Sequence, residues 1–315
     1  MRLEGIHHIT AITGDAPGNV DFYARVLGLR LVKKTVNQDQ PSVYHLFYAD
    51  EQGSPGADVT FFEFPGAAPG RAGAGMVHTI VWRVASEEAL DFWTGRLAVD
   101  GVETTRGDGS LRFADPEGLG HELLVAAVPD QPLIADHPEV PRELALQGFH
   151  AARAYASDPD ASRALIEEQL GFTPVDADPA HPGDIGATRA YEVRGERRGG
   201  LWIYDEPPAE PGREGAGTVH HIAWASEMDD HEAWRERALA GGARATEVID
   251  RFWFRSIYFR EPSGVLFEIA TLGPGFDADE DLAHLGEKLV LPPKLEPLRE
   301  NIEATLTPIV NPRTA

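Results

Sequence analysis

The stretch "VHHIAWAS", residues 219–226, has three counterparts in the chain, each a short apolar run with a histidine near its start. They are "GIHHITAI" (5–12), "MVHTIVWRV" (76–84) and "GFHAARAYA" (148–156). Short runs rich in β-branched and aromatic residues are typical of strands. Self-similarity at a regular spacing indicates a repeat architecture. The sequence therefore predicts four copies of one unit, each beginning with such a strand.

A helical stretch follows each of these predicted first strands. Asp or Ser precedes or opens the stretch in most units and Gly closes it, as helix-capping chemistry predicts. The four stretches lie at 17–28, 86–101, 160–171 and 229–242. Further β-rich runs follow each helix, among them "VTFFEF" and "RSIYFR". The repeated unit thus has the order βαβββ, and the predicted fold class is α+β.

A Pro-rich segment, "VPDQPLIADHPEVPRE", divides the chain into two halves of two units each. The last part of the Pro-interrupted C-terminal extension is predicted to form an amphipathic helix. The predicted boundaries are 1–127 for the first half (units at about 4–66 and 75–127), 128–145 for the linker, 146–274 for the second half (units at about 146–206 and 217–272) and 275–315 for the extension.

Composition narrows the classes of protein. The 315 residues, 42% of them hydrophobic, can bury a large core. The absence of cysteine excludes disulfides and thiolate sites, and the net charge of −23 argues against nucleic-acid binding. The N-terminus has no apolar leader and no run is long enough to span a bilayer. We therefore expect a cytoplasmic protein without nucleic-acid or membrane partners.

A second repeat lies near the ends of units two and four. The runs "FADPEGLGHELL" (113–124) and "FREPSGVLFEIA" (259–270) share Phe, an acid-Pro pair, Gly two residues after the Pro and Glu six after it. Glu122 and Glu268 therefore occupy the same position in their units. Glu268 lies between "VLF" and "IA", which predicts burial, and a buried carboxylate needs a cation.

The histidine pairs of units one and four can be sorted by strand alternation, because successive side chains point to opposite faces of a sheet. His220 shares its face with the bulky Ile222 and Trp224, whereas His221 shares the other face with small alanines. The same reasoning separates His7 from His8. Alternation therefore predicts that His7 and His220 lie on the helix side and that His8 and His221 face the other side.

Units two and three keep only the first histidine of the pair. His78 and His150 match His7 and His220, whereas Thr79 and Ala151 stand where the second histidine would be. A structural role is the simplest interpretation of the histidine that all four units share. The second histidine, restricted to units one and four, predicts a metal site formed by His8, His221 and Glu268.

These motifs resemble the vicinal oxygen chelate superfamily, which includes glyoxalases, bleomycin resistance proteins and extradiol dioxygenases. Within it, the chain is similar to the ring-cleaving dioxygenases that act on hydroquinones. The similarity covers nearly the whole chain, through "HHIT", "FYARVLGLRLVKKTVNQD", "YHLFYADEQGSPG", "HHIAW", "DRFWFRSIYFREPSGVLFEIAT" and "HLGEKLVLPP". The resemblance implies cupped mixed or antiparallel sheets, with units one and four around the metal and units two and three forming the other cup.

The resemblance also implies the ligands and the chemistry. Carried onto this sequence, the metal ligands are His8, His221 and Glu268, which strand alternation selects as well. Catechol-cleaving relatives take their histidines from units three and four, and Ala151 disfavours that arrangement here. Two histidines and a carboxylate with open positions suit non-haem Fe(II), although Mn(II) suits the same ligands. The implied reaction opens a small aromatic diol of the hydroquinone type with O2.

Five further residues are expected around the metal, as hydroxyl donors, acid–base groups or charges near the substrate. They are Tyr258, His7, Thr10, His220 and Arg251. Alternation points His7 and His220 away from the cup, unless the strand bulges. Arg251 could instead form a surface salt bridge. His45, in "VYHLFYAD", is another candidate with an equally acceptable structural role.

Two alternatives remain open from the sequence. A glyoxalase-type lyase or isomerase on the same scaffold would add a fourth carboxylate ligand, for which Glu63 and Glu122 are the candidates. A metal-free protein that only sequesters a ligand would not need the three ligands. The C-terminal extension could wrap around a second copy, so a homo-oligomer is a further expectation.

Overall fold

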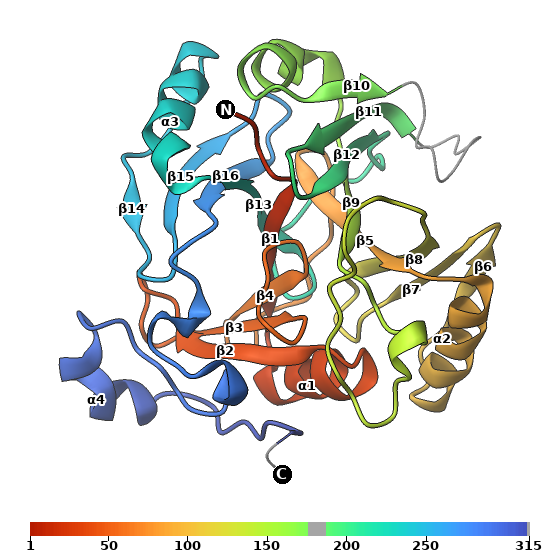
Figure 1. Cartoon of the computed structure of the whole chain (residues 1–315), viewed down its shortest axis with the longest axis vertical. Helices are drawn as coiled ribbons and strands as arrows, with labels where there is room; N and C mark the ends of the chain where they lie inside the picture. Colours follow the sequence, from red (N-terminus) through yellow and green to blue (C-terminus); the bar gives the residue numbers. More distant parts are fainter. Residues whose placement is uncertain (176–186, 314–315) are drawn as a thin grey trace.

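Two eight-stranded sheets form the framework of the protein in a computed structural model that describes residues 1–175 and 187–313 (Figure 1). The strand order of the first sheet is β14-β15-β16-β13-β1-β4-β3-β2. Its strands are β1 (Ile6–Thr13), β2 (Arg30–Val36), β3 (Tyr44–Ala49), β4 (Asp58–Glu63), β13 (Val219–Ser226), β14 (Ile249–Asp250), β15 (Arg255–Arg260) and β16 (Leu266–Thr271). The sheet is thus built from units one and four.

The second sheet is built from units two and three. Its strand order is β10-β11-β12-β9-β5-β8-β7-β6. Its strands are β5 (Met76–Val84), β6 (Thr105–Gly107), β7 (Ser110–Ala114), β8 (Gly120–Val125), β9 (Phe149–Tyr155), β10 (Thr173–Val175), β11 (Ala187–Arg194) and β12 (Gly199–Asp205). Both sheets mix parallel and antiparallel pairs, so the α+β class and the pairing of units implied by the resemblance are confirmed.

The helical stretches lie where the sequence predicts them, although two are partly π-helical. They are α1 (Ala16–Val20) continuing into η1 (Asp21–Val26), α2 (Glu87–Val99), η3 (Pro159–Ser162) followed by η4 (Ala164–Gln169), and η5 (Met228–Asp230) leading into α3 (His231–Ala240). The side chains of Asp15 and Ser86 accept backbone N–H groups at the starts of α1 and α2, as N-caps do.

The helices pack in pairs at opposite ends of the molecule. Arg96 on α2 donates to the carbonyl of Val26 in η1, at the lower end in Figure 1, and Arg237 on α3 donates to that of Gln169 in η4, at the upper end. Helices therefore pair within each half of the chain, whereas strands pair across the halves. The core on the helix side is largely aromatic, with Trp82, Trp93 and Trp224 fully buried.

The repeated turns have a structural explanation. The carboxylate of Asp115 accepts the backbone N–H groups of Glu117 and Leu119, and that of Glu261 accepts those of Ser263 and Val265. Each acid therefore closes its own turn, which the acid-Pro-x-Gly pattern makes possible. The turn delivers the following strand, β8 or β16, to the centre of its sheet.

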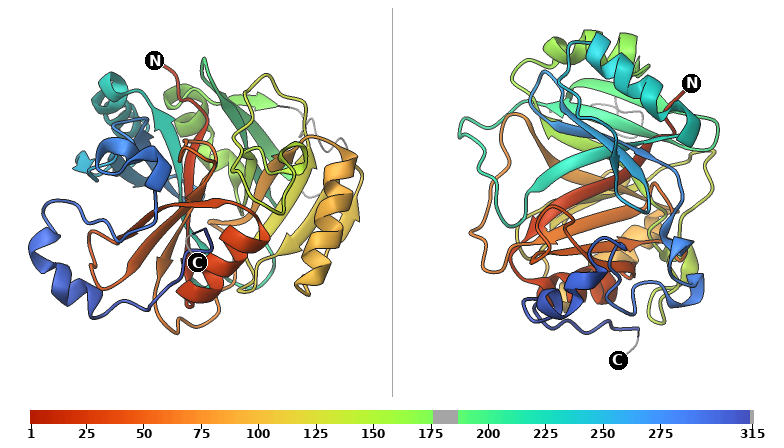
Figure 2. Two further views of the ribbon diagram at one scale, coloured as in Figure 1. Left: turned by 60° about the horizontal axis from the view of Figure 1, so that its bottom comes forward. Right: turned by 90° about the vertical axis from the view of Figure 1, so that its left-hand side faces the viewer.

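The C-terminal extension runs along the outside of the first sheet (Figure 2). Val290 donates its backbone N–H to the carbonyl of Lys34 on the edge strand β2, which the extension thereby covers. Its short helical turns are η6 (Phe276–Ala278), η7 (Leu282–His284), η8 (Glu296–Leu298) and α4 (Arg299–Glu303); η2 (Arg142–Leu144) lies in the linker. The predicted amphipathic helix is thus only the five-residue α4, whose Ile302 packs against Val36 and Leu291.

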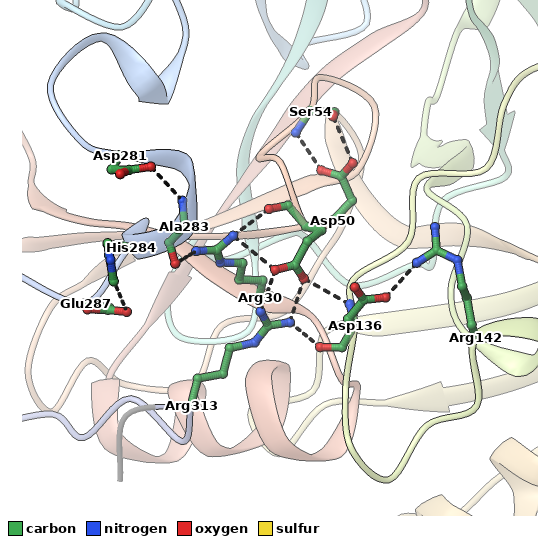
Figure 3. Close-up of polar contacts among 11 residues, drawn as sticks. Arg30, Asp50, Ser54, Asp136, Arg142, Asp281, Ala283, His284, Glu287 and Arg313 are labelled. Atoms are coloured by element: carbon green, nitrogen blue, oxygen red, sulfur yellow. Dashed lines mark hydrogen bonds and ion pairs between the residues drawn. The ribbon is translucent and has the colours of Figure 1, made fainter.

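Charged side chains hold the end of the extension to the rest of the molecule (Figure 3). Arg313 pairs with Glu51 through both carboxylate oxygens, at 2.9 and 3.0 Å, and also contacts the carbonyl of Asp136 in the linker. Arg30 on β2 donates to the carbonyls of Glu51 and Ala283. The extension, the linker and the first sheet are therefore joined at one place.

Lys33 on β2 makes a second connection to the extension. Its side chain is fully buried, and its ammonium donates to Asp279 at 2.9 Å and contacts Glu280. Asp279 also accepts the indole N–H of Trp253 at 2.9 Å. A buried charge is tolerated when it is paired and hydrogen-bonded in this way. No helix among the described residues is both long and apolar enough to cross a bilayer.

Candidate metal centre

Three side chains from adjacent strands meet at the centre of the first sheet. His8 lies on β1, His221 on β13 and Glu268 on β16, and all are buried. Oε2 of Glu268 is 2.9 Å from Nε2 of His221 and 3.2 Å from Nε2 of His8. The two Nε2 atoms are 3.3 Å apart. The structure therefore brings together the three residues that the sequence predicts as ligands, in a group that can hold a metal ion.

A β-bulge precedes each of the two ligand histidines. In the β1–β13 pair, Ile6 faces Trp224 and His8 faces Ala223, so His7 has no residue opposite it. On the other strand, His221 faces Thr10 and Val219 faces Ala11, so His220 has no residue opposite it either. A bulge interrupts strand alternation because two residues oppose one. Both members of each pair therefore point to the same side. The ring centroids of His7 and His8 lie 5.4 and 5.3 Å from that of Phe254. In the second pair, Nδ1 of His220 lies 2.8 Å from Nδ1 of His221. The expectation that His7 and His220 face the helices is wrong.

The second sheet has the same two bulges. His78 and His150 are the extra residues of the β5–β9 pair, between Val77 and Thr79 and before Ala151. The histidine shared by all four units is thus a bulge residue. His78 stacks on Tyr155 at 3.9 Å and contacts Asp205 at 2.8 Å.

The second sheet lacks a metal triad within the described residues. Thr79 and Ala151 take the places of the histidines, as the sequence shows. Glu122 takes the place of Glu268, and the guanidinium of Arg112 lies 2.8 Å from its carboxylate. Arg112 faces Glu122 across β7 and β8 as Tyr258 faces Glu268 across β15 and β16. An arginine here supplies the positive charge that the triad would take from a metal.

The hydrogen bonds behind His8 fix its tautomer. The backbone carbonyl of Thr271 can only accept, so Nε2 of His7, 3.1 Å away, carries the proton. Burial, followed by the neighbouring His8, lowers the pKa of His7 to about 3, so its ring is neutral and its Nδ1 is an acceptor. Nδ1 of His8, 2.9 Å away, must therefore donate to it. In the neutral His8 ring, this leaves a lone pair on Nε2, directed toward the Glu268 carboxylate.

A lone pair beside an ionised carboxylate calls for a cation between them. Burial raises the pKa of Glu268, but His8 and His221 outweigh it and hold the pKa well below its usual range, so the group is ionised near neutral pH. Burial lowers the pKa of His221 to about 4, so His221 does not supply the positive charge. Metal-binding histidines commonly donate their second ring N–H to a neighbouring acceptor, as His8 does. The donor set therefore fits a divalent metal.

A cavity of about 280 Å³ opens above the triad. Apart from His8 and His221, its wall is formed by mostly aromatic and polar side chains and one leucine, from β3, β4, β13, β15, β16 and adjoining loops. They are Asn37, Gln38, Asp39, His45, Phe47, Phe62, Phe64, Glu214, His220, Arg251, Trp253, Phe254, Tyr258 and Leu266. Four predicted residues, Tyr258, Arg251, His220 and His45, thus line the cavity. His7 and Thr10 do not; His7 lies behind His8, and the hydroxyl of Thr10 bonds that of Thr60 at 2.8 Å.

Tyr258 and Arg251 form one side of the cavity. The Tyr258 ring is 5.7 Å from that of His221, and the Arg251 guanidinium lies 5.5 Å above the phenol ring. Burial, followed by the charge of Glu268, raises the pKa of Tyr258, so the phenol keeps its proton. Arg251 also pairs with Asp39 at 2.9 Å. Arg251 thus forms an ion pair, as the sequence allowed, and also lines the cavity.

The aromatic part of the wall was not predicted from the sequence. Trp253 and Phe254 follow Phe252, whose φ of +75° is rare for a residue other than glycine. The carboxylate of Asp250 accepts the N–H of Phe252 and stabilises this turn. The turn directs the next two side chains into the cavity. The signal in the sequence was the aromatic run "FWF" immediately after Asp-Arg.

Neither candidate for a fourth carboxylate ligand belongs to the triad. Glu63 accepts the backbone N–H of Ala16 at the start of α1, and Glu122 lies in the second sheet. Among the described residues, the group that could hold a metal at this place contains only His8, His221 and Glu268. The remaining coordination positions are therefore free for exogenous ligands.

Comparison with known proteins agrees with this arrangement. Residues 5–123 and 148–269 match the family described as the Glyoxalase/Bleomycin resistance protein/Dioxygenase superfamily. The chain belongs to this superfamily. Individual proteins of this superfamily match the chain over nearly its whole length. It is 41% identical over 312 residues to "Putative ring-cleaving dioxygenase MhqO" of Bacillus subtilis, covering 98% of this chain and 97% of that protein.

Two further superfamily members bear on the site. The chain is 33% identical over 328 residues to the chlorohydroquinone/hydroquinone 1,2-dioxygenase of Sphingobium indicum, with 98% of each protein covered. A crystal structure of a Bacillus subtilis protein described as a dioxygenase superposes with a TM-score of 0.90 at 39% identity, covering 98% of each chain. Maize glyoxalase I, at a TM-score of 0.58 and 15% identity, shares the fold alone.

Proposed function

We propose that the protein is an Fe(II)-dependent dioxygenase that opens the ring of hydroquinone-type diols. The observation that supports this most strongly is the buried triad of His8, His221 and Glu268, in which two imidazole nitrogens and a carboxylate oxygen converge. Two histidines and one carboxylate are typical of non-haem Fe(II) oxygenases. The similarity to a hydroquinone dioxygenase over the whole chain supports the substrate class.

The metal would be held by Nε2 of His8, Nε2 of His221 and the carboxylate of Glu268. When bound, Fe(II) supplies the open positions at which a phenolate and O2 can meet and exchange electrons. The charge of one carboxylate on a divalent ion leaves one net positive charge, which favours an anionic phenolate. The apolar wall formed by Phe47, Phe62 and other aromatic rings holds the diol and excludes water.

The surrounding side chains take distinct parts in this proposal. The Tyr258 phenol keeps its proton and donates a hydrogen bond to an oxygen of the substrate or of O2. His220, at the edge of the cavity, accepts or returns a proton. Arg251 keeps positive charge beside Tyr258. His7 orients His8, and Thr10 acts from outside the cavity through Thr60.

The test is oxygen consumption by the anaerobically purified protein loaded with Fe(II), with hydroquinone, methylhydroquinone, chlorohydroquinones and catechol as substrates. We expect O2 uptake with the para-diols and a new absorbance from a ring-opened product. Glu268→Gln should abolish both and lower the iron content. Glu122→Gln, at the matching position of the second sheet, should keep the iron content of the unmodified protein.

Two results would contradict the proposal. Tight binding of Zn(II) or Ni(II), without O2 uptake from any diol, would favour a glyoxalase-type lyase or isomerase. A protein that binds diols but no stoichiometric metal would be one that sequesters its ligand. Activity with Mn(II) in place of Fe(II) would revise the metal and leave the reaction in place.

A further inference from the structure

His45 lines the cavity and uses one of its two ring nitrogens in a hydrogen bond. Its Nε2 is 2.9 Å from the hydroxyl of Thr60 on β4. Its ring lines the cavity, and its Nδ1 makes no hydrogen bond among the described residues. Burial, followed by the neighbouring histidines His8 and His221, lowers its pKa well below the usual value, so the ring is neutral. A neutral imidazole offers either a donor or an acceptor to the cavity, depending on its tautomer.

The two threonines behind His45 select the tautomer. Thr10 is fully buried, and its hydroxyl has Thr60 as its hydrogen-bond partner, 2.8 Å away, with no other among the described residues. If His45 donated to Thr60, then Thr60 would donate to Thr10, and the Thr10 hydrogen would be buried without an acceptor. The opposite direction leaves no such hydrogen, and an unsatisfied buried donor is unfavourable. Thr10 therefore donates to Thr60, Thr60 donates to Nε2 of His45, and Nδ1 of His45 carries an N–H that is available to a ligand in the cavity.

His45 is separated from the triad by about the width of one aromatic ring. The ring of Phe62 lies 4.4 Å from that of His45 on one side and 6.3 Å from that of His221 on the other. Within the sheet, β4 lies between β1, which holds His8, and β3, which holds His45. Two strand spacings correspond to roughly 10 Å between the backbones of β1 and β3. An aromatic ring bound to the metal by one hydroxyl would extend across this interval.

We propose that His45 recognises the second hydroxyl of the substrate, the one that does not bind the metal, and thereby selects para-diols over ortho-diols. This inference rests on the proposed function. The Nδ1–H of His45 donates to the oxygen at the far end of the ring. An ortho-diol holds both oxygens beside the metal and leaves this donor unpaired. Sites that hydrogen-bond a substrate hydroxyl reject analogues without it for the same reason.

The contacts of His45 also fix its position. Its ring packs between Phe47, at 3.9 Å, and Phe62, at 4.4 Å. His45 pairs with Phe62 in the register of β3 and β4, so a strand and not a loop carries it. A donor held by packing and by a hydrogen bond loses little entropy when it meets its ligand. This is the property required of a residue that distinguishes two positions on one small ring.

The test compares ligands with one and two hydroxyls. The Fe(II)-loaded protein is titrated under anaerobic conditions with hydroquinone, catechol and phenol, and the dissociation constants are measured by calorimetry. In His45→Phe, which keeps an aromatic ring between Phe47 and Phe62, hydroquinone affinity should fall about tenfold, the usual effect of one hydrogen bond. Phenol affinity should change less than about twofold, because phenol has no second hydroxyl.

Two variants complete the design. His45→Asn places an amide N–H near the former Nδ1 and should recover part of the preference for hydroquinone over phenol. His284→Phe, the same substitution at an exposed histidine of the extension, should leave all three affinities unchanged. Iron content and thermal unfolding show that each variant is folded and loaded.

The outcomes separate this inference from the proposed function. Equal loss of hydroquinone and phenol affinity in both His45 variants would overturn the role of His45, because it would show only a change in packing. An unchanged preference for hydroquinone over catechol in His45→Phe would overturn it as well. If the unmodified protein binds no diol and consumes no O2, the proposed function itself fails.

Discussion

The residues that decide the chemistry of the site are the neighbours of the ligands as much as the ligands. His7 can accept from His8 because its other nitrogen donates to a backbone carbonyl. That arrangement holds the His8 ring with Nε2 directed toward Glu268. The two adjacent histidines of the motif therefore have separate parts, one as a ligand and one as its support.

Replacement of His7 by Phe tests this support. The change leaves the Nδ1–H of His8 without its acceptor, so the ring loses its orientation. Because such outer partners are worth about 10- to 100-fold in metal affinity, we expect a loss of this size. A competition titration of Fe(II) against a chelator measures it. His78→Phe, at the matching bulge of the second sheet, should leave the metal affinity unchanged, and an equal loss there would contradict the role of His7.

Residue patterns in the sequence predicted the ligands but not the directions of their neighbours. His8, His221 and Glu268 could be selected because only units one and four carry the second histidine. The directions of the His7 and His220 side chains could not be predicted, because alternation holds only for regular strands. A bulge is defined by the count of residues on the facing strand, and that strand lies about two hundred residues away in the sequence.

At the scale of the elements, a buried hydrogen-bonded chain joins unit one to unit two. Trp82 on β5 donates to Nδ1 of His121 on β8, at 3.1 Å. Nε2 of His121 therefore carries the proton and donates to the hydroxyl of Tyr23 in η1, at 2.9 Å. Tyr23 in turn donates to Asp115, at 2.9 Å. Every donor in the chain has an acceptor.

Tyr23→Phe should destabilise the protein by about 2–3 kcal/mol, because it leaves the His121 N–H and an Asp115 oxygen buried without a partner. Chemical denaturation followed by tryptophan fluorescence measures the free energy of unfolding. Tyr44→Phe is the control, since the buried Tyr44 hydroxyl makes no hydrogen bond among the described residues. Equal effects of the two substitutions would show that the chain contributes nothing specific.

The same chain predicts a pH dependence of stability. Burial raises the pKa of Asp115 to about 6 in the folded protein, above its usual value. A raised carboxyl pKa gives a stabilising contribution that is complete below the unfolded-state pKa and is lost as the pH rises through the folded-state pKa. Relative to Asp115→Asn, which cannot titrate, the protein should lose up to about 3 kcal/mol between about pH 4 and about pH 7. Urea denaturation at each pH measures this difference, and a constant difference would contradict the prediction.

The elements themselves could largely be predicted, and their exceptions have physical causes. The four first strands and the helical stretches lie where periodicity and capping residues indicated. The π-helical turns η1 and η4 could not be foreseen, since they depend on tertiary packing more than on local sequence. The C-terminal helix was overestimated because its prolines limit it to one short segment and the apolar residues before it cover β2.

For the molecule as a whole, the C-terminal extension supports the wall of the cavity from outside, because Asp279 connects buried Lys33 to Trp253, which lines the cavity. Asp279→Ala should destabilise the protein by about 1–3 kcal/mol, since Lys33 loses one of its two carboxylates and the Trp253 indole loses its acceptor. It should also raise KM for hydroquinone, because Trp253 lines the cavity. Thermal unfolding and steady-state O2 uptake measure the two effects. Glu300→Ala, at an exposed position of α4, is the control and should change neither quantity. An unchanged KM in Asp279→Ala would show that Trp253 holds its place without the extension.

The pairing of unit one with unit four has a consequence for the folding of the protein during its synthesis on the ribosome. Units two and three are adjacent in the chain, so the second sheet can close while synthesis continues, whereas β1 must wait for β13 and β16. His8 lies on β1 and Glu268 on β16, the first and the last strand among the described residues. A nascent chain therefore has no complete triad until β16 has been made. A chain that is interrupted before β16 lacks Glu268, so it cannot assemble the candidate metal site.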